Sequence, residues 1–243
     1  MQIQVAAAKI GKYASPESGD TLEMIERPHG GLSLVLADGQ RSGRAAKAIS
    51  NLVTSKAVSL LADGVRDGAA ARATHDYLYT HRGGKVSATL NIVSVDMVTG
   101  TLVLSRNSHC PVIVQTSPDG QHLLDAPAPP IGIHRATKPQ IAELPLGIGM
   151  LVVIYTDGVQ SAGERRGQPL DVPACVSALY RDHHQAQHIA RPIADGLLDE
   201  AMQRDDGRPQ DDMSVLVVAV AGEAPDEVRR LQVSFPIPPL YRP

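Results

Sequence analysis

The chain alternates between short apolar runs and longer stretches in which apolar side chains recur every three or four residues. Short apolar runs with turn residues at their ends are typical of buried strands, and they occur at residues 3–8, 32–36, 88–95, 101–105, 111–115, 150–155 and 213–221. Residues 21–26 mix apolar and acidic side chains, and we expect them to pair with residues 32–36 as a hairpin.

The helical spacing is clearest in the stretch that ends at Gly64, where the apolar stripe is formed by Ala45, Ile49, Leu52, Val53, Val58 and Leu61. A second helix is expected over residues 67–81, and two more within residues 171–203. The resulting order is strands, helices, strands, helices and a final strand. Because strand and helix do not alternate strictly, this order predicts an α+β fold with antiparallel sheets covered by helices.

We expect a single domain over residues 1–243, because the sequence contains no repeat, no low-complexity stretch and no linker that would divide it. The core of this domain covers about residues 3–221. Residues 222–243 form a C-terminal tail, in which residues 228–235 are a candidate edge strand and the Pro-rich end is expected to fray.

Composition narrows the classes of function. Hydrophobic residues make up 43% of the chain but aromatic residues only 3%, so the core must be aliphatic. The net charge of −3 gives no basic surface for nucleic acid. We see no secretion signal, no apolar run long enough to span a bilayer, and only two cysteines. We therefore expect a soluble cytoplasmic protein.

Aspartates lie at the ends of several expected strands. Asp38 and Asp157 follow apolar runs and are each followed by glycine, Asp211 and Asp212 precede the last run, and Asp20 opens the early hairpin. One Asp-Gly after a strand is explained by a turn. Several carboxylates that converge at one mouth of a sheet cannot all stay ionised without cations, and hard oxygen ligands select Mg²⁺ or Mn²⁺.

Two such ions, about 3.5–4 Å apart, can clamp a phosphoryl group and lower the pKa of a water toward neutrality. The glycine after Asp38 fits this chemistry, because a residue without a side chain lets its carbonyl approach an ion closely.

The chain resembles the metal-dependent phosphatases of the protein phosphatase 2C type, and within them the bacterial branch of the sporulation stage II E and sigma-B regulator phosphatases. The resemblance is carried, in family order, by Gly19-Asp20, Val35-Leu36-Ala37-Asp38-Gly39, Ser42-Gly43, Ser87-Ala88-Thr89-Leu90, Asn107-Ser108-His109, Pro130-Ile131-Gly132-Ile133, Ile154-Tyr155-Thr156-Asp157-Gly158 and Asp211-Asp212-Met213-Ser214-Val215-Leu216-Val217-Val218. Each motif alone is weak to moderate, but the ordered set is specific.

The resemblance implies a central β-sandwich of two antiparallel sheets flanked by helices. It also implies two Mn²⁺ or Mg²⁺ ions, with Asp38 bridging both, Asp20 and the Gly39 carbonyl on one, and Asp157 and Asp211 on the other. The implied reaction is attack of an activated water on a phosphoserine or phosphothreonine, without a phosphoenzyme. Asp212 falls where many relatives have an asparagine that supports the site.

The chain departs from the family pattern at residue 42, where Ser42 replaces a histidine found in many bacterial relatives. Arg41 and Arg44 are either phosphate contacts or solvated residues at a helix start. Glu23 is either a support for the metal site or an exposed strand residue. His109 lies between two expected strands, and we expect it to stabilise that turn.

These observations predict a metal-dependent protein serine/threonine phosphatase. The family branch implies a partner in stress-response signalling, namely a small phosphorylated protein such as an anti-sigma factor antagonist. An alternative is a binding module of phosphatase ancestry that has lost turnover, which the serine at position 42 would favour. A hydrolase of small phosphate esters is a third possibility that the sequence does not separate from the first.

Overall fold

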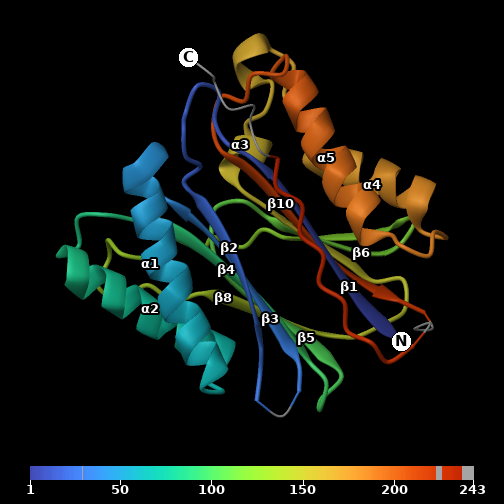
Figure 1. The fold of residues 1–243 in the computed structure, drawn as a ribbon, viewed down its shortest axis with the longest axis horizontal. Helices are drawn as coiled ribbons and strands as arrows, with labels where there is room; N and C mark the ends of the chain where they lie inside the picture. The colour runs from blue at the N-terminus through green and yellow to red at the C-terminus, as the bar shows by residue number, and fades with distance from the viewer. Residues whose placement is uncertain (29, 223–225, 237–243) are drawn as a thin grey trace.

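The computed structural model describes residues 1–28, 30–222 and 226–236. Two five-stranded sheets, in which every pair of neighbouring strands is antiparallel, form its centre (Figure 1). The first sheet has the order β1 (Gln2–Ile10), β10 (Met213–Ala221), β9 (Leu151–Tyr155), β6 (Val112–Ser117) and β7 (Gly120–Leu124). The second has the order β2 (Asp20–Glu26), β3 (Leu32–Gly39), β4 (Ala88–Asp96), β5 (Thr101–Asn107) and β8 (Gln140–Pro145). The α+β sandwich expected from the sequence is confirmed.

Helices cover the outer face of each sheet (Figure 1). The second sheet is covered by α1 (Gly43–Ala62) and α2 (Asp67–Arg82), and the first by α4 (Val172–His183) and α5 (Ala190–Arg204). A short helix, α3 (Asp157–Gln160), follows β9 directly, and a 3-10 turn occupies Glu164–Arg166. No helix in the described part of the chain combines the length and the apolar character needed to cross a membrane.

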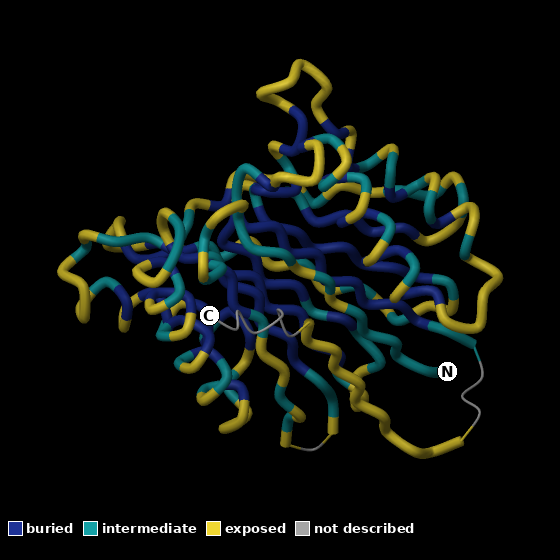
Figure 2. The backbone as a smooth tube through the Cα atoms, turned by 45° about the horizontal axis from the view of Figure 1, so that its top comes forward, coloured by how far each residue is buried: buried dark blue, intermediate teal, exposed yellow. Residues whose placement is uncertain are grey.

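The central strands of both sheets are mainly apolar because both of their faces are buried. On β3, Leu34 and Leu36 face the other sheet, whereas Val35 and Ala37 pack against α1 and α2. Successive side chains of a strand point to opposite faces. Each sheet lies between the other sheet and a layer of helices, so its central strands need apolar residues on both faces. Figure 2 shows this buried character concentrated in the strands, with exposure in helices and loops.

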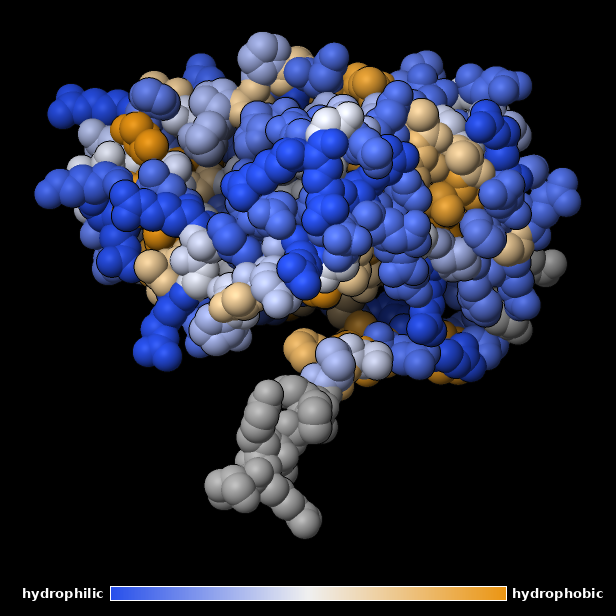
Figure 3. All heavy atoms as spheres, turned by 90° about the horizontal axis from the view of Figure 1, so that it is seen from above, coloured by the Kyte–Doolittle hydropathy of each residue, from blue (hydrophilic) through white to orange (hydrophobic). Residues whose placement is uncertain are grey.

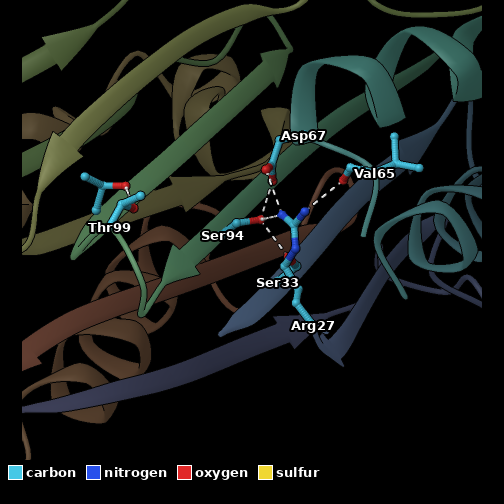
Figure 4. A network of polar contacts seen from close by, with 7 residues as sticks. Arg27, Ser33, Val65, Asp67, Ser94 and Thr99 are labelled. Carbon is cyan, nitrogen blue, oxygen red and sulfur yellow. Dashed lines mark hydrogen bonds and ion pairs between the residues drawn. The ribbon is translucent and has the colours of Figure 1, made fainter. Parts of the chain in front are cut away.

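A largely buried polar network lies at the end of the second sheet where β2 ends and β3 begins (Figure 4). The Arg27 guanidinium donates to Asp67 at 2.9 Å and to the Val65 carbonyl at 2.8 Å. The hydroxyl of Ser94 on β4 donates to Asp67 and lies 2.6 Å from the hydroxyl of Ser33 on β3. The network therefore ties the start of α2 to three strand ends.

Two edge strands, β7 and β8, were not expected from the sequence. The reverse holds for the tail: the described residues 226–236 contain no strand, so the edge strand expected at residues 228–235 is wrong. The apolar side chains of the tail are not buried against a sheet, since Leu231 and Phe235 are 72% and 82% exposed. An ion pair of 2.5 Å between Arg229 and Glu26 on β2 contacts the sandwich instead.

Candidate metal centre

The aspartates singled out from the sequence meet at one end of the sandwich, the upper end in Figure 1. Asp20 opens β2 and lies opposite Asp38 near the end of β3. In the first sheet, Tyr155 at the end of β9 pairs with Val215 on β10. This register brings the residues after β9 beside those before β10, and so places Asp157 near Asp211. Seen from above, this face of the molecule is mainly hydrophilic (Figure 3).

Asp20 is the most enclosed of these carboxylates. Its side chain is fully buried, and its Oδ2 accepts hydrogen bonds from the Ser214 hydroxyl at 2.5 Å and the Thr156 hydroxyl at 3.0 Å. Its Oδ1 has no hydrogen-bond partner in the described structure. Because a buried carboxylate oxygen without a partner is costly, this atom is suited to a cation.

The pKa shifts of the aspartates indicate that their carboxylates lie close enough to influence one another. Burial raises the pKa of Asp38 above its ordinary value, and the charges of Asp20, Asp157 and Asp211 raise it further. Burial also raises the pKa of Asp20, against the opposing effect of its two hydroxyl donors. For Asp157, burial and then Asp211 raise the pKa. Mutual repulsion of this kind is relieved by divalent cations.

Two glycines let other backbone segments approach the aspartates. A Cβ on Gly39 would lie 2.0 Å from the carbonyl oxygen of Ala46 on α1. A Cβ on Gly158 would lie 2.2 Å from the carbonyl oxygen of Asp212. Both positions therefore require glycine for steric reasons. The close contact at Gly39 seats α1 directly beside the end of β3.

Asp212 has a supporting position rather than a free one. Its two oxygens accept hydrogen bonds from the backbone amides of Lys12, at 2.9 Å, and Gly19, at 2.7 Å. Asp212 thus fixes the loop that leads into Asp20. The supporting role expected for Asp212 stays a prediction.

The remaining candidate residues lie at the rim. Glu23 is exposed on β2, three residues from Asp20 and therefore on the opposite face of the strand. Arg41 is exposed with a left-handed backbone (φ 74°), and Arg44 is exposed with only a 4.0 Å contact to Glu17. Ser42 is the N-cap residue of α1, without a side-chain capping bond.

The donor set fits a hard divalent cation. It consists of carboxylate oxygens, including the unpartnered Oδ1 of Asp20, and these are the ligands that Mg²⁺ and Mn²⁺ prefer. Among the described residues, no three Asp, Glu, His or Cys side chains already converge closely enough to enclose an ion. Closure on an ion therefore requires rotation of side chains, for which Asp38, Asp157 and Asp211 have room because they are only partly buried.

Two site residues, Thr156 and Ser214, were not assigned a role from the sequence. Both belong to motifs noted there, and each is a hydroxyl residue next to or within an apolar run. A hydroxyl at such a position needs a buried partner. The signal was therefore present, but the identity of the partner depended on how the two sheets pack against each other, because Asp20 belongs to the other sheet.

Comparison with known proteins places this arrangement in a family context. The family model described as stage II sporulation protein E (SpoIIE) matches residues 28–221. Stage II sporulation protein E of Bacillus subtilis (strain 168) is 22% identical over 242 residues, which cover 99% of this chain and 28% of that protein. The chain thus spans little more than a quarter of the curated relative.

Solved structures share the fold. The PP2C phosphatase domain of SpoIIE from Bacillus subtilis, solved with a fragment of its regulatory domain, superposes with a TM-score of 0.77 at 22% identity, covering 92% of this chain and 64% of that one. The RsbU and RsbW domains of a Mycobacterium tuberculosis protein give a TM-score of 0.73 at 21% identity, covering 92% and 61%. At these identities the likeness establishes the fold.

Proposed function

The chain belongs to the stage II sporulation protein E family of metal-dependent protein serine/threonine phosphatases, and from this premise we propose that it hydrolyses phosphoserine or phosphothreonine in a protein. The observation that carries the proposal is the group of aspartates at one end of the sandwich, where Asp20, Asp157 and Asp211 each raise the pKa of Asp38. We take residues 1–243 as one phosphatase domain with its core at about 3–221.

Each residue of the site has a part in this proposal. Asp38 would bridge two Mn²⁺ or Mg²⁺ ions, since it is the carboxylate that the other three surround electrostatically. Asp20 and the Gly39 carbonyl would hold one ion, and Asp157 and Asp211 the other. When bound, such a pair of cations neutralises phosphate charge and makes a water nucleophilic near neutral pH.

The protein's own contribution is to hold these carboxylates in place. The hydroxyls of Thr156 and Ser214 fix the orientation of Asp20 through its Oδ2. The other oxygen, Oδ1, has no hydrogen-bond partner among the described residues and would be left for an ion. Asp212 keeps the loop before Asp20 in place through two backbone amides. Such supporting contacts tune ligand orientation and typically change metal affinity by about 10–100-fold.

We infer that the substrate is a small phosphorylated signalling protein of the anti-sigma factor antagonist type. The support for this inference is the branch of the family that the sequence motifs resemble.

The test is hydrolysis of phosphoserine, phosphothreonine and phosphotyrosine peptides by the purified chain, first with EDTA and then with Mn²⁺ or Mg²⁺. We expect turnover of the first two peptides that requires metal and is lost in Asp38→Ala. The matched control is Asp199→Ala, which removes an exposed carboxylate on α5 and should behave like the wild type. Absence of turnover in folded, metal-bound protein would instead favour a binding module.

A further inference from the structure

The loop that joins β5 to β6 lies at the metal-centre end of the sandwich. β5 belongs to the second sheet and β6 to the first, so residues 108–111 cross from one sheet to the other. Asn107, the last residue of β5, pairs with Leu90 on β4. The preceding residue of β4, Thr89, pairs with Asp38. The crossing loop therefore begins at the same end of the second sheet as Asp38, with β4 between them.

Contacts from the interior of the protein fix this loop. The Arg106 guanidinium donates to the carbonyls of Ser108 and Cys110, and the Cys110 amide donates to the Ser108 hydroxyl at 3.1 Å. Ser108 and Cys110 are buried, whereas His109 between them is exposed. The role expected for His109, stabilising the turn, thus belongs to Arg106 and Ser108. In the described structure the His109 side chain has no hydrogen bond or ion pair of its own.

The strand register places His109 close to a candidate metal ligand. Ile113 on β6 lies opposite Val153 on β9 in an antiparallel pair. His109 precedes Ile113 by four residues and Asp157 follows Val153 by four, so both residues lie beyond the same end of this strand pair. The electrostatics agree, because His109 lowers the pKa of Asp157 while burial and Asp211 raise it more strongly.

The neighbouring residue of the loop, Cys110, is subject to the same charges. The pKa of the Cys110 thiol is raised first by burial and then by the charge of Asp157, with a smaller contribution from Asp38. The loop is therefore close enough to Asp157 and Asp38 for the charges of both to act on it. The loop is held by its neighbours and carries the exposed His109 imidazole at the end of the sandwich where the aspartates lie.

The chemistry of this position favours a phosphate contact over a metal contact. Mg²⁺ and Mn²⁺ prefer oxygen ligands, which the aspartates already supply. An imidazole N–H is a hydrogen-bond donor suited to a phosphate oxygen. Ser42, the N-cap residue of α1, offers a hydroxyl and no imidazole. We propose that His109 donates a hydrogen bond to an oxygen of the substrate's phosphate group, an inference that rests on the proposed function.

The test measures binding without turnover. Mn²⁺ affinity is determined first for the wild type, His109→Ala, His109→Gln and the control His122→Ala, which removes an exposed histidine on edge strand β7. Inorganic phosphate is then titrated into each Mn²⁺-bound protein by calorimetry. We expect His109→Ala to weaken phosphate binding about tenfold, as loss of a hydrogen bond to a charged group does. His109→Gln, which keeps a donor, should retain part of the affinity, and His122→Ala should match the wild type.

Two results would overturn the inference and leave the proposed function intact. One is unchanged phosphate affinity in His109→Ala. The other is weakened Mn²⁺ binding in the same variant, which would make His109 a metal ligand. Failure of the wild type to bind Mn²⁺ would overturn the proposed function itself, and this inference with it. Because His109 is exposed and its loop is held by other residues, we expect the variants to keep the melting temperature of the wild type.

Discussion

Asp20 on β2 lies directly opposite Asp38 on β3 in the antiparallel pair that forms one edge of the second sheet. Side chains at such positions have Cβ atoms about 4.5–5.5 Å apart, and like charges there are destabilising. The sandwich thus contains a built-in repulsion at one end, which only protonation or a bound cation removes. The predictions below follow from this repulsion and from the contacts around it.

Asp38→Asn removes the central charge while keeping the size of the side chain. We expect the melting temperature in EDTA to rise by about 3 °C, the shift that roughly 1 kcal/mol produces in a chain of this size. The rise that Mn²⁺ causes in the wild type should be lost at the same time. Differential scanning fluorimetry with and without Mn²⁺ measures both effects. A variant that is destabilised in EDTA and still stabilised by Mn²⁺ would contradict this prediction.

The stability of the metal-free protein should depend on pH. Burial, followed by neighbouring carboxylates, raises the pKa of Asp38 in the folded state from its ordinary value of 3.8. The folded state then binds more protons than the unfolded state at any pH between the two pKa values. The free energy of unfolding should therefore fall as pH rises above about 4 through that window.

Urea unfolding in EDTA at about pH 5.5 and about pH 8 checks this dependence. Mg²⁺ should stabilise the wild type more at the higher pH, where the carboxylates are free of protons. Equal stabilisation at both values would argue against ionisation of the cluster as the cause.

Gly39→Ala should damage the junction between β3 and α1. The new Cβ would lie 2.0 Å from the Ala46 carbonyl oxygen, so α1 must shift. We expect a loss of about 1–3 kcal/mol, the range seen when a packed interior is overfilled. Gly147→Ala is the matched control, because a Cβ there meets no atom within 4 Å. Chemical denaturation of the two variants and the wild type decides the point.

Ser214→Ala should weaken metal binding without unfolding the protein. The Ser214 hydroxyl donates to Asp20 at 2.5 Å and favours its charged form. We expect Mn²⁺ affinity to fall about tenfold, as loss of a residue that supports a ligand typically causes. Ser59→Ala, at an exposed position of α1, serves as control. Mn²⁺ titration monitored by electron paramagnetic resonance gives the affinities, and equal values would exclude the supporting role.

Asp67→Asn tests the opposite end of the second sheet. The substitution leaves the Arg27 guanidinium, which now pairs with Asp67 at 2.9 Å in a largely buried network, without its counter-charge (Figure 4). We expect a loss of about 3 kcal/mol, the usual cost of breaking a buried ion pair. Mn²⁺ affinity of the folded variant should remain that of the wild type. Unfolding curves and Mn²⁺ titration of the same sample separate the two effects.

The sequence predicted the buried strands well because each carries apolar residues on both faces. The edge strands were harder to predict. β8 (Gln140–Pro145) alternates exposed and half-buried positions and contains polar residues, so it lacks the signal of a buried run. For the tail, a strand was predicted where the structure has none. Leu231, Val233 and Phe235 alternate along the sequence as in a strand, but they lie exposed outside either sheet.

At the site, the aspartates were identifiable because each interrupts or borders an apolar run. The hydrogen-bond partners of these aspartates were harder to predict from the sequence, because the contacts join residues far apart in the chain. Asp212 binds the amide of Gly19 across 193 positions, and Ser214 binds Asp20 across 194. Local patterns do not specify such pairs, because they form where one sheet packs against the other. The placement of His109 and Asp157 at the same end of the first sheet depends likewise on contacts between distant parts of the chain.

The number of Mn²⁺ ions bound per chain tests the central claim most directly, namely that these aspartates form a two-metal centre. Electron paramagnetic resonance titration of the purified wild type should reach two ions per chain, and Asp38→Asn, which lacks the carboxylate proposed to bridge both ions, should retain neither. Asp199→Asn, the exposed control on α5, should bind as the wild type does. An Asp38→Asn variant that still binds two ions with unchanged affinity would show that the metal centre lies elsewhere.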